Sequence, residues 1–315
     1  MPSSILLAMP LAPRLRSRLD ALYEVHGPMK PVAPEGIPEG ARGARALITL
    51  GGHRTDVAMM DALPELGLIA CYGTGFEGVD VEAARARGIV VTHAKDANAT
   101  SVAEFAMGLV IAAARDMGKG ERSLRAGTWR SIETMSLVPG LAGRRMGIYG
   151  LGSIGMKIAS RAAAFEMEIG YHGRAPKAGV AYEYHATLRE LAAWCDVLVV
   201  AVRASEETRH AVGREVLEAL GKDGVLVNIS RGLVVDEAAL AEALEQRVIH
   251  AAGLDVFEHE PAVPARLLAV PNAVLTPHIA AFTTAAQRLQ TQTMLDALAA
   301  FFAGQRPGNV VPGLF

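Results

Sequence analysis

Three polar side chains that could act on one substrate follow apolar, strand-like runs of the sequence. Arg231 follows the run 225–229, Glu260 the run 251–257 and His278 the run 273–275. An arginine can hold a carboxylate and polarise a ketone, while a histidine can protonate the ketone oxygen as hydride reaches the carbon. A glutamate beside the imidazole stabilises its protonated form. Together the three predict reduction of a 2-keto acid. Taken singly, the arginine could be an ordinary surface cation and the histidine a structural loop residue.

A cofactor for such a reaction is indicated by the run Gly150-Leu151-Gly152-Ser153-Ile154-Gly155, which lies between an apolar strand and an Ala-rich helix. This is the G-x-G-x-x-G pattern of a dinucleotide-binding turn. Gly150 permits the tight turn, Gly152 lets the backbone approach a pyrophosphate, and Gly155 allows the helix to pack closely on the strand. The first helical N–H groups, at Ser153 and Ile154, can bind phosphate. A plain glycine-rich turn is the alternative, and the flanking elements favour the cofactor site.

The choice between NADH and NADPH depends on the end of the next strand. An NAD-type site carries an acid about twenty residues after the glycines, where it binds the ribose 2′-hydroxyl. The sequence there is Tyr171-His172-Gly173-Arg174-Ala175-Pro176-Lys177, which has no acid and two cations. A guanidinium can bind a 2′-phosphate that a carboxylate would repel. We therefore expect Gly173, Arg174 and Lys177 to favour NADPH over NADH, with two solvated loop cations as the alternative.

Composition narrows the class of protein. The chain has 315 residues, enough for two domains that share a cleft, and a formal net charge of −2, which gives no sign of a nucleic-acid surface or a polybasic membrane patch. Cys71 and Cys195 lie in apolar runs without metal-ligand spacing, so we expect buried thiols and no metal site. No run approaches the roughly twenty apolar residues of a membrane span. A cytoplasmic protein without membrane or nucleic-acid partners is expected.

Strand-like and helical segments alternate along the chain, which predicts an α/β fold of parallel βαβ units. The expected strands are 4–8, 46–50, 68–72, 89–92, 144–149, 168–172, 197–202, 225–229, 251–256 and 273–275. The expected helices are 13–22, 56–63, 81–87, 99–115, the helix after the glycine run and 283–302. Because the dinucleotide turn is central, we expect two Rossmann-like or flavodoxin-like domains with an interdomain cleft. Residues 1–97 plus 283–315 would form a discontinuous substrate-binding domain, and 98–282 the dinucleotide-binding domain.

A series of motifs, taken in order, resembles the D-isomer-specific 2-hydroxyacid dehydrogenases over almost the whole chain. They are the loop Tyr72–Asp80, the helix start Thr100–Glu104, the glycine run, the segments around Arg231 and Glu260, and the segment Leu275–Ala281. The resemblance implies that Arg231 anchors the substrate, that His278 is the general acid/base, and that Glu260 keeps His278 protonated. It implies substrate contacts from Thr74, Gly75 and Phe76. It implies cofactor contacts from Val202, Asn228, Ile229, Ser230, Asp255, His278, Ala280 and Ala281.

Further implications of the resemblance concern single positions. Asp255 would bind the nicotinamide carboxamide, and Ser101 and Val102 would lie near the ring, although a helix N-cap equally explains Thr100 or Ser101. Glu258 is expected to be a solvated loop acid. Val202-Arg203 stands where many relatives have Thr-Pro or a similar small pair. Arg203 would lie near the adenosine or at the cleft mouth, or would be an exposed cation. In the first loop, Glu77 replaces the aspartate usual in the family.

The family resemblance also implies a homodimer. The segment 120–139, with Trp129, is similar to the arm through which such dimers pack, and a surface loop held by a buried tryptophan is the alternative.

The sequence thus predicts NAD(P)H-dependent reduction of a small 2-keto acid to a D-2-hydroxy acid, with NADPH preferred. The Gly173-Arg174 pair is similar to the NADPH-using glyoxylate/hydroxypyruvate reductase branch, which also suggests 2-ketogluconate as a substrate. One alternative is a dinucleotide-sensing binding protein on the same scaffold, like the transcriptional corepressors that resemble this family. Formate oxidation is disfavoured because it has no use for an acid/base.

Overall fold

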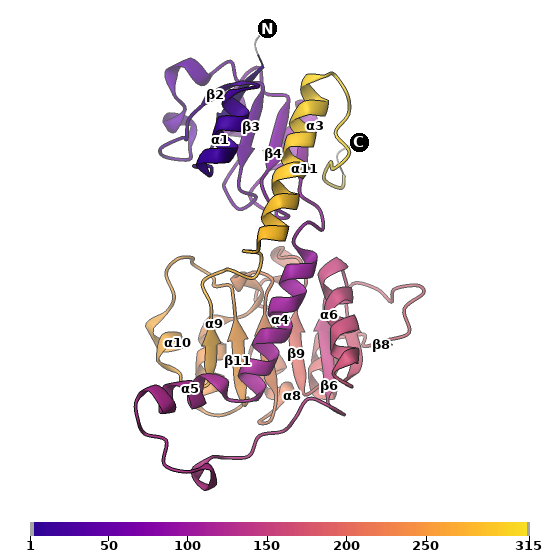
Figure 1. The fold of residues 1–315 in the computed structure, drawn as a ribbon. Helices are drawn as coiled ribbons and strands as arrows, with labels where there is room; N and C mark the ends of the chain where they lie inside the picture. Colours follow the sequence, from indigo (N-terminus) through magenta and orange to yellow (C-terminus); the bar gives the residue numbers. More distant parts are fainter. Residues whose placement is uncertain (1–2, 314–315) are drawn as a thin grey trace. The chain divides into compact units, whose positions relative to one another are not determined.

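The computed structural model describes residues 3–313, so residues 1–2 and 314–315, at the outer ends of the expected substrate-binding domain, lie outside the description. The chain divides into two units (Figure 1). Unit 1 comprises the described residues up to Asn98 together with those from Thr283 onward, and unit 2 is Ala99–Phe282.

Unit 1 contains a five-stranded parallel sheet in the order β2-β1-β3-β4-β5, which is the flavodoxin order. Its strands are β1 (Ser4–Leu7), β2 (Glu24–His26), β3 (Ala46–Thr49), β4 (Leu68–Cys71) and β5 (Val90–His93). Its helices are α1 (Pro13–Asp20), α2 (Val57–Asp61), α3 (Val81–Ala86) and α11 (Thr284–Phe302). The last of these returns from the far end of the sequence and packs on β4 and β5.

The core of unit 1 follows from the period of two in its strands. Ile5 and Leu7 pack on one face of the sheet with Leu19 of α1 and Leu298 of α11, whereas Leu6 points to the other face. Because helices or loops cover both faces, β1, β3 and β4 are buried at every position and are almost wholly apolar, as expected for a parallel sheet.

Unit 2 contains a seven-stranded parallel sheet in the order β12-β11-β10-β9-β6-β7-β8. Its strands are β6 (Arg145–Tyr149), β7 (Glu168–His172), β8 (Glu183–Tyr184), β9 (Val197–Val200), β10 (Val225–Asn228), β11 (Ala251–Leu254) and β12 (Ala273–Leu275). Numbered from β6, these strands follow the 3-2-1-4-5-6 Rossmann order with one strand added. The prediction of an α/β chain with two parallel sheets is therefore confirmed.

The helices of unit 2 cover both faces of its sheet (Figure 1). They are α4 (Ala99–Ala114), α5 (Met117–Arg125), α6 (Ser153–Ala164), α7 (Leu188–Trp194), α8 (Arg214–Leu220), α9 (Glu237–Glu245) and α10 (Ala265–Ala269). Short 3-10 turns in the described chain span Pro34–Gly36, Glu39–Ala41, Ile132–Thr134, Glu206–Thr208 and Gly232–Val234.

Helix α4 is the apolar segment that the sequence predicts to be buried. It packs on α6, β10 and β11, and a side chain at Gly253 would press against Leu109. Since α4 already starts at Ala99, Thr100 and Ser101 lie inside its first turn, and the interpretation of either as the N-cap is wrong.

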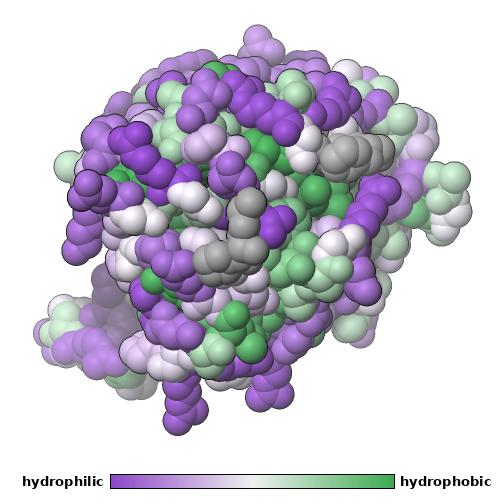
Figure 2. All heavy atoms as spheres, turned by 90° about the horizontal axis from the view of Figure 1, so that it is seen from above, coloured by the Kyte–Doolittle hydropathy of each residue, from purple (hydrophilic) through white to green (hydrophobic). Residues whose placement is uncertain are grey.

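The surface of unit 1 at the end that carries the chain termini is shown in Figure 2. Hydrophilic side chains cover most of this face, with apolar ones in smaller groups between them. Such a mixture is ordinary for protein exposed to water. Among the described residues, no helix is both long and apolar enough to cross a membrane.

Candidate active site

The glycine run forms the turn between β6 and α6. Gly150 has φ +99°, and a Cβ there would lie 2.6 Å from the backbone N and Cα of Val202. Both the left-handed conformation and the close approach therefore require glycine. This contact brings the backbone of Val202, which follows β9, against the turn.

The other two glycines also match the geometry of a dinucleotide site. A side chain at Gly155 would overlap the carbonyl oxygen of Gly150, so this glycine lets α6 pack on the turn. Gly152 is the N-cap of α6, and a Cβ there would meet no atom within 4 Å. The backbone at Gly152 is therefore open at the N-terminus of α6, as the approach of a phosphate group to a helix start requires.

The end of β7 carries no acidic residue. The His172 ring stacks on Tyr149 with centroids 5.5 Å apart, and its Nδ1 donates to the His185 carbonyl oxygen over 2.9 Å. Arg174 is exposed, and the Lys177 ammonium donates to the carbonyl oxygen of Leu151 in the glycine turn over 3.1 Å. Lys177 therefore lies beside the turn, although its side chain, like that of Arg174, is exposed.

Asn228, at the end of β10, organises the turn that carries Arg231. Its Oδ1 accepts from the backbone N and from the hydroxyl of Ser230 at 3.0 and 2.9 Å, and its Nδ2 donates to the Arg231 carbonyl oxygen at 3.0 Å. Asn228 and Ser230 are buried, as is Ile229 between them. The Asn228 amide thus shapes the turn internally, a role that the sequence did not indicate.

Asp255 binds the loop that carries His278. One of its carboxylate oxygens accepts from the Thr276 hydroxyl at 2.7 Å and the Ile279 N–H at 2.9 Å, and the other accepts from the Ala280 N–H at 2.8 Å. Asp255, which is buried, therefore holds the turn around His278.

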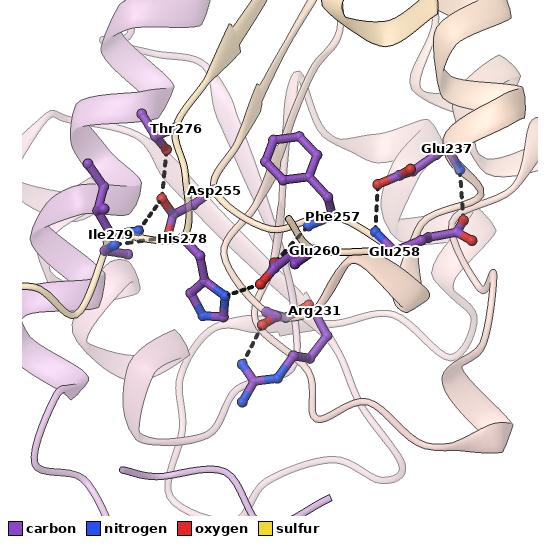
Figure 3. A network of polar contacts seen from close by, with 11 residues as sticks. Arg231, Glu237, Asp255, Phe257, Glu258, Glu260, Thr276, His278 and Ile279 are labelled. Carbon is purple, nitrogen blue, oxygen red and sulfur yellow. Dashed lines mark hydrogen bonds and ion pairs between the residues drawn. The ribbon is translucent and has the colours of Figure 1, made fainter. Parts of the chain in front are cut away.

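His278 and Glu260 form the pair that the sequence predicts (Figure 3). The imidazole Nδ1 lies 2.7 Å from Glu260 Oε2, and Glu260 Oε1 accepts from the Phe257 N–H at 3.0 Å. An ionised carboxylate can only accept, so Nδ1 carries a proton and Nε2 is the nitrogen that exchanges one. The side chains are 43% and 35% exposed, so the pair can reach a substrate.

Two features orient these groups. His278 has φ +54°, a left-handed backbone that costs a non-glycine residue roughly 1–2 kcal/mol. The Arg231 guanidinium donates to the Ser230 carbonyl oxygen at 2.8 Å and projects from its loop in the same direction as the imidazole (Figure 3). Backbone strain held in place by hydrogen bonds is typical of functional sites.

Glu258 departs from the sequence-based prediction. Its side chain is only 17% exposed, its carboxylate lies 3.0 Å from His210 Nε2, and it accepts from the Glu237 N–H at 3.2 Å. The interpretation of Glu258 as a solvated loop acid is therefore wrong. No sequence signal links positions 237 and 258, because only the packing of α9 beside the loop brings them together.

In unit 1 the glycine-rich loop after β4 lies on the loop after β3. A Cβ at Gly51 would overlap the carbonyl of Gly75, and the Thr74 carbonyl oxygen accepts from His93 Nδ1 at 2.8 Å. The Phe76 side chain is buried and packs edge-on against the His93 ring. The backbone of Thr74 and Gly75 is thus held against His93 and Gly51, and the Phe76 side chain belongs to the core of unit 1.

The structure also shows the surroundings of Trp129 and of the two cysteines. Trp129 is 53% exposed, so the interpretation of it as a buried anchor is wrong. Cys71 and Cys195 are buried free thiols as predicted, and burial raises the pKa of each to about 12. Over residues 3–313, no group of histidine, cysteine and acidic side chains is arranged to hold a metal ion.

Parallel sheets in the flavodoxin and Rossmann orders, a dinucleotide turn and an imidazole–carboxylate pair beyond the strand ends define a nicotinamide-dependent dehydrogenase. Residues 107–280 match the family model described as "D-isomer specific 2-hydroxyacid dehydrogenase, NAD binding domain". The chain belongs to this family. It is accordingly an oxidoreductase that interconverts a 2-keto acid and a 2-hydroxy acid with NAD(P)H.

Similar proteins include reductases of several substrates. A glyoxylate/hydroxypyruvate reductase of Arabidopsis thaliana is 39% identical over 86% of this chain and 84% of its own length. A 2-ketogluconate reductase of Gluconobacter oxydans is 37% identical over 95% of both chains. The crystal structure of an NADPH-dependent glyoxylate/hydroxypyruvate reductase from Sinorhizobium meliloti, in complex with NADP and malonate, has a TM-score of 0.93 and 38% identity. That comparison covers 100% of this chain and 98% of the other.

Proposed function

We propose that the protein is an NADPH-preferring reductase that converts a small 2-keto acid, of the glyoxylate, hydroxypyruvate or 2-ketogluconate type, to the D-2-hydroxy acid. The observation that carries this proposal is the 2.7 Å hydrogen bond between His278 Nδ1 and Glu260, with Arg231 projecting from the neighbouring turn. A ketone needs a proton donor, and this pair supplies one.

In the proposed reaction, each side chain has a separate task. The Arg231 guanidinium binds the substrate carboxylate and polarises the ketone. His278 gives its Nε2 proton to the ketone oxygen. Before this transfer, the hydrogen bond between Nδ1 and Glu260 stabilises the imidazolium. NADPH, when bound, supplies the hydride. In the reverse direction the neutral imidazole accepts the hydroxyl proton.

The cofactor is proposed to bind along the carboxyl ends of β6, β7, β9 and β10. Gly150, Gly152 and Gly155 shape the turn for the pyrophosphate, and the absence of an acid after β7 removes the group that would repel a 2′-phosphate. We assign the 2′-phosphate to Arg174 and Lys177, because the Lys177 ammonium already lies at the turn. Asp255 is assigned to the nicotinamide carboxamide from the family pattern.

The remaining contacts are assigned from the family pattern. Thr74, Gly75 and the Phe76 backbone would bind the substrate carboxylate from unit 1. The segments Asn228–Ser230 and Ala280–Ala281 would line the cofactor site, the former mainly through its backbone because the Asn228 amide is engaged within its own turn.

Loss of catalysis without loss of cofactor binding tests the assignment. Arg231→Ala and His278→Ala should each lose most turnover of glyoxylate or hydroxypyruvate, followed by NADPH absorbance, while fluorescence titration shows NADPH still bound. Wild-type rates in either variant would refute the assigned roles. If the wild-type protein binds NADPH but reduces none of glyoxylate, hydroxypyruvate, pyruvate, phenylpyruvate and 2-ketogluconate, a dinucleotide-sensing role would be favoured instead.

The cofactor preference is tested separately. Arg174→Ala and Lys177→Ala should lower kcat/KM for NADPH far more than kcat/KM for NADH, because only NADPH carries the 2′-phosphate. A wild-type protein that prefers NADH would contradict this part of the proposal and leave the catalytic assignment standing.

We also propose a homodimer formed through the segment 120–139 together with the start of helix α5, whose later residues belong to that segment. Large apolar side chains are exposed there, namely those of Met117, Leu124, Trp129, Ile132, Met135 and Leu137. A monomer rarely exposes so many apolar side chains on one segment. Light scattering should give twice the chain mass for the wild type and the monomer mass for Leu137→Asp combined with Trp129→Asp. A monomeric wild type would refute this proposal.

A cytoplasmic location is proposed from the two thiols. Cys71 and Cys195 are buried and unpaired, as is usual in proteins of reducing compartments. Fractionation with an antibody against the chain tests this location, and recovery in an oxidising compartment would contradict it.

A further inference from the structure

Two carboxylates outside the proposed catalytic set bind each other's backbone. Glu237 is the first residue of α9, and its side chain is buried. Glu237 Oε1 accepts from the Glu258 N–H at 2.7 Å, and Glu258 Oε1 accepts from the Glu237 N–H at 3.2 Å (Figure 3). Each carboxylate thus accepts a hydrogen bond from the backbone N–H of the other residue, and the two bonds fasten the start of α9 to the loop after β11.

The fastened peptide directly follows the one whose N–H binds Glu260. The Phe257 N–H donates to Glu260 Oε1, and the next N–H along the chain, that of Glu258, donates to Glu237. On its other side this peptide lies against Gly232, where a Cβ would overlap the Phe257 carbonyl carbon and the Glu258 nitrogen. The peptide between residues 257 and 258 is therefore held from both sides. Gly232, which lies against it, directly follows Arg231, and Glu260 lies two residues beyond Glu258.

Electrostatics indicate that this arrangement does not serve stability alone. Burial raises the pKa of Glu237, and the nearby carboxylates of Glu258 and Glu260 raise it further, while its bond from the Glu258 N–H and the nearby His259 lower it. His210 Nε2 lies 3.0 Å from Oε1 of Glu258. Gathering the carboxylates of Glu237, Glu258 and Glu260 near one another costs folding free energy, and such clusters are found preferentially at functional sites.

We infer that Glu237 and Glu258 are positioning residues, whose reciprocal hydrogen bonds hold the 257–258 peptide so that Glu260 can orient His278. Neither acid need touch substrate or cofactor. This inference rests on the proposed function, because it assigns them to the alignment of the proposed acid/base pair.

The test compares substitutions that keep or remove the hydrogen-bond acceptor. Glu258→Gln and Glu237→Gln retain an oxygen that can accept the same N–H, whereas Glu258→Ala and Glu237→Leu do not. We expect the second pair to lose between about 10- and 100-fold in kcat for keto-acid reduction, since misplacement of a catalytic group has effects of that size. The Gln variants should stay near wild type, and Kd for NADPH should be unchanged in all four.

A pH profile separates positioning from general loss of structure. Reduction requires protonated His278, so its rate falls as the pH rises. In Glu258→Ala the Glu260 carboxylate is held less firmly and stabilises the His278 imidazolium less. The fall in rate should therefore occur at lower pH than in the wild type. Glu245→Ala is the matched control, because Glu245 lies on the same helix and pairs with Arg266 at the surface. It should leave kcat and the pH profile unchanged.

Each outcome has a distinct meaning. Wild-type kcat and an unmoved pH profile in Glu258→Ala would overturn the inference, provided that His278→Ala is inactive. A fully active His278→Ala would instead defeat the proposed function itself. If Glu237→Leu does not fold, Glu258→Ala at its partly exposed position decides the matter. Gln variants as impaired as the Ala and Leu variants would also overturn the inference, because the acceptor would then be irrelevant.

Discussion

Replacing Glu260 with glutamine isolates the contribution of one charge to the proposed proton transfer. The amide is nearly the same size as the carboxylate, and its oxygen can still accept from the Phe257 N–H, which lies 3.0 Å from Glu260 Oε1. What changes is the bond to His278 Nδ1, at 2.7 Å in the native protein. A neutral amide stabilises the imidazolium far less than a carboxylate does.

The size of the effect follows from the exposure of the pair. A hydrogen bond to a charged group contributes about 1.5–3 kcal/mol. Because the side chains of His278 and Glu260 are 43% and 35% exposed, water screens their attraction and the lower part of that range applies. With about 1.4 kcal/mol for each factor of ten, a loss of roughly 1.5–2 kcal/mol lowers kcat/KM by about 10- to 30-fold.

The assay is keto-acid reduction followed by NADPH absorbance over a range of pH, together with fluorescence titration of NADPH. We expect the loss in kcat/KM, a fall in rate that begins at lower pH than in the wild type, and an unchanged Kd for NADPH. Glu168→Gln, which alters a surface carboxylate paired with Arg145, is the control. Wild-type kcat/KM in Glu260→Gln with an unmoved pH profile would refute the role assigned to this pair.

Three further predictions concern packing and titration. Gly232→Ala should lower Tm and cost about 1–3 kcal/mol of unfolding free energy, because its Cβ would overlap backbone atoms that cannot move aside; an unchanged urea unfolding curve would contradict this. Cys71 and Cys195 have pKa values raised to about 12, so a thiol reagent at pH 8 should label neither in the native protein and both in urea; rapid native labelling would count against their burial. The pKa of Glu237 is raised in the folded state, so its ionisation destabilises the protein as pH rises above the unfolded value of about 4.3. The Tm of Glu237→Gln relative to wild type should therefore increase from pH 4 to neutral pH, and a difference that is flat or falls with pH would exclude this linkage.

Much of the fold was predictable because it depends on local patterns. The apolar runs at Ile5–Leu7 and Val197–Val200 identify buried parallel strands, since both faces of each sheet are covered. Short elements were missed, including α7, although Thr187 and Glu190 form a capping box at its start. Seven helical residues carry too little periodicity to be distinguished from a loop. The strand β2 was missed for the same reason.

The site was predictable in its residue types and not in its supporting bonds. The glycine run and the spacing of Arg231, Glu260 and His278 pointed to the chemistry, because parallel strands deliver their ends to one edge. The contact of Lys177 with the Leu151 carbonyl had no sequence signal, and neither did the use of Asp255 to hold the loop around His278. Both contacts depend on how separate loops pack against one another once the sheet has formed.

The sequence by itself determined the α/β fold with its two parallel sheets, the dinucleotide turn and the identity of the proposed acid/base pair. These follow from side-chain period, glycine geometry and the chemistry of single residues. Only the tertiary structure decided that Glu237 and Glu258 fasten the peptide behind Glu260, and that Gly232 must lack a side chain beside it. Hydrogen bonds and close contacts between residues about twenty or more positions apart exist only once the chain has packed, so no local pattern could reveal them.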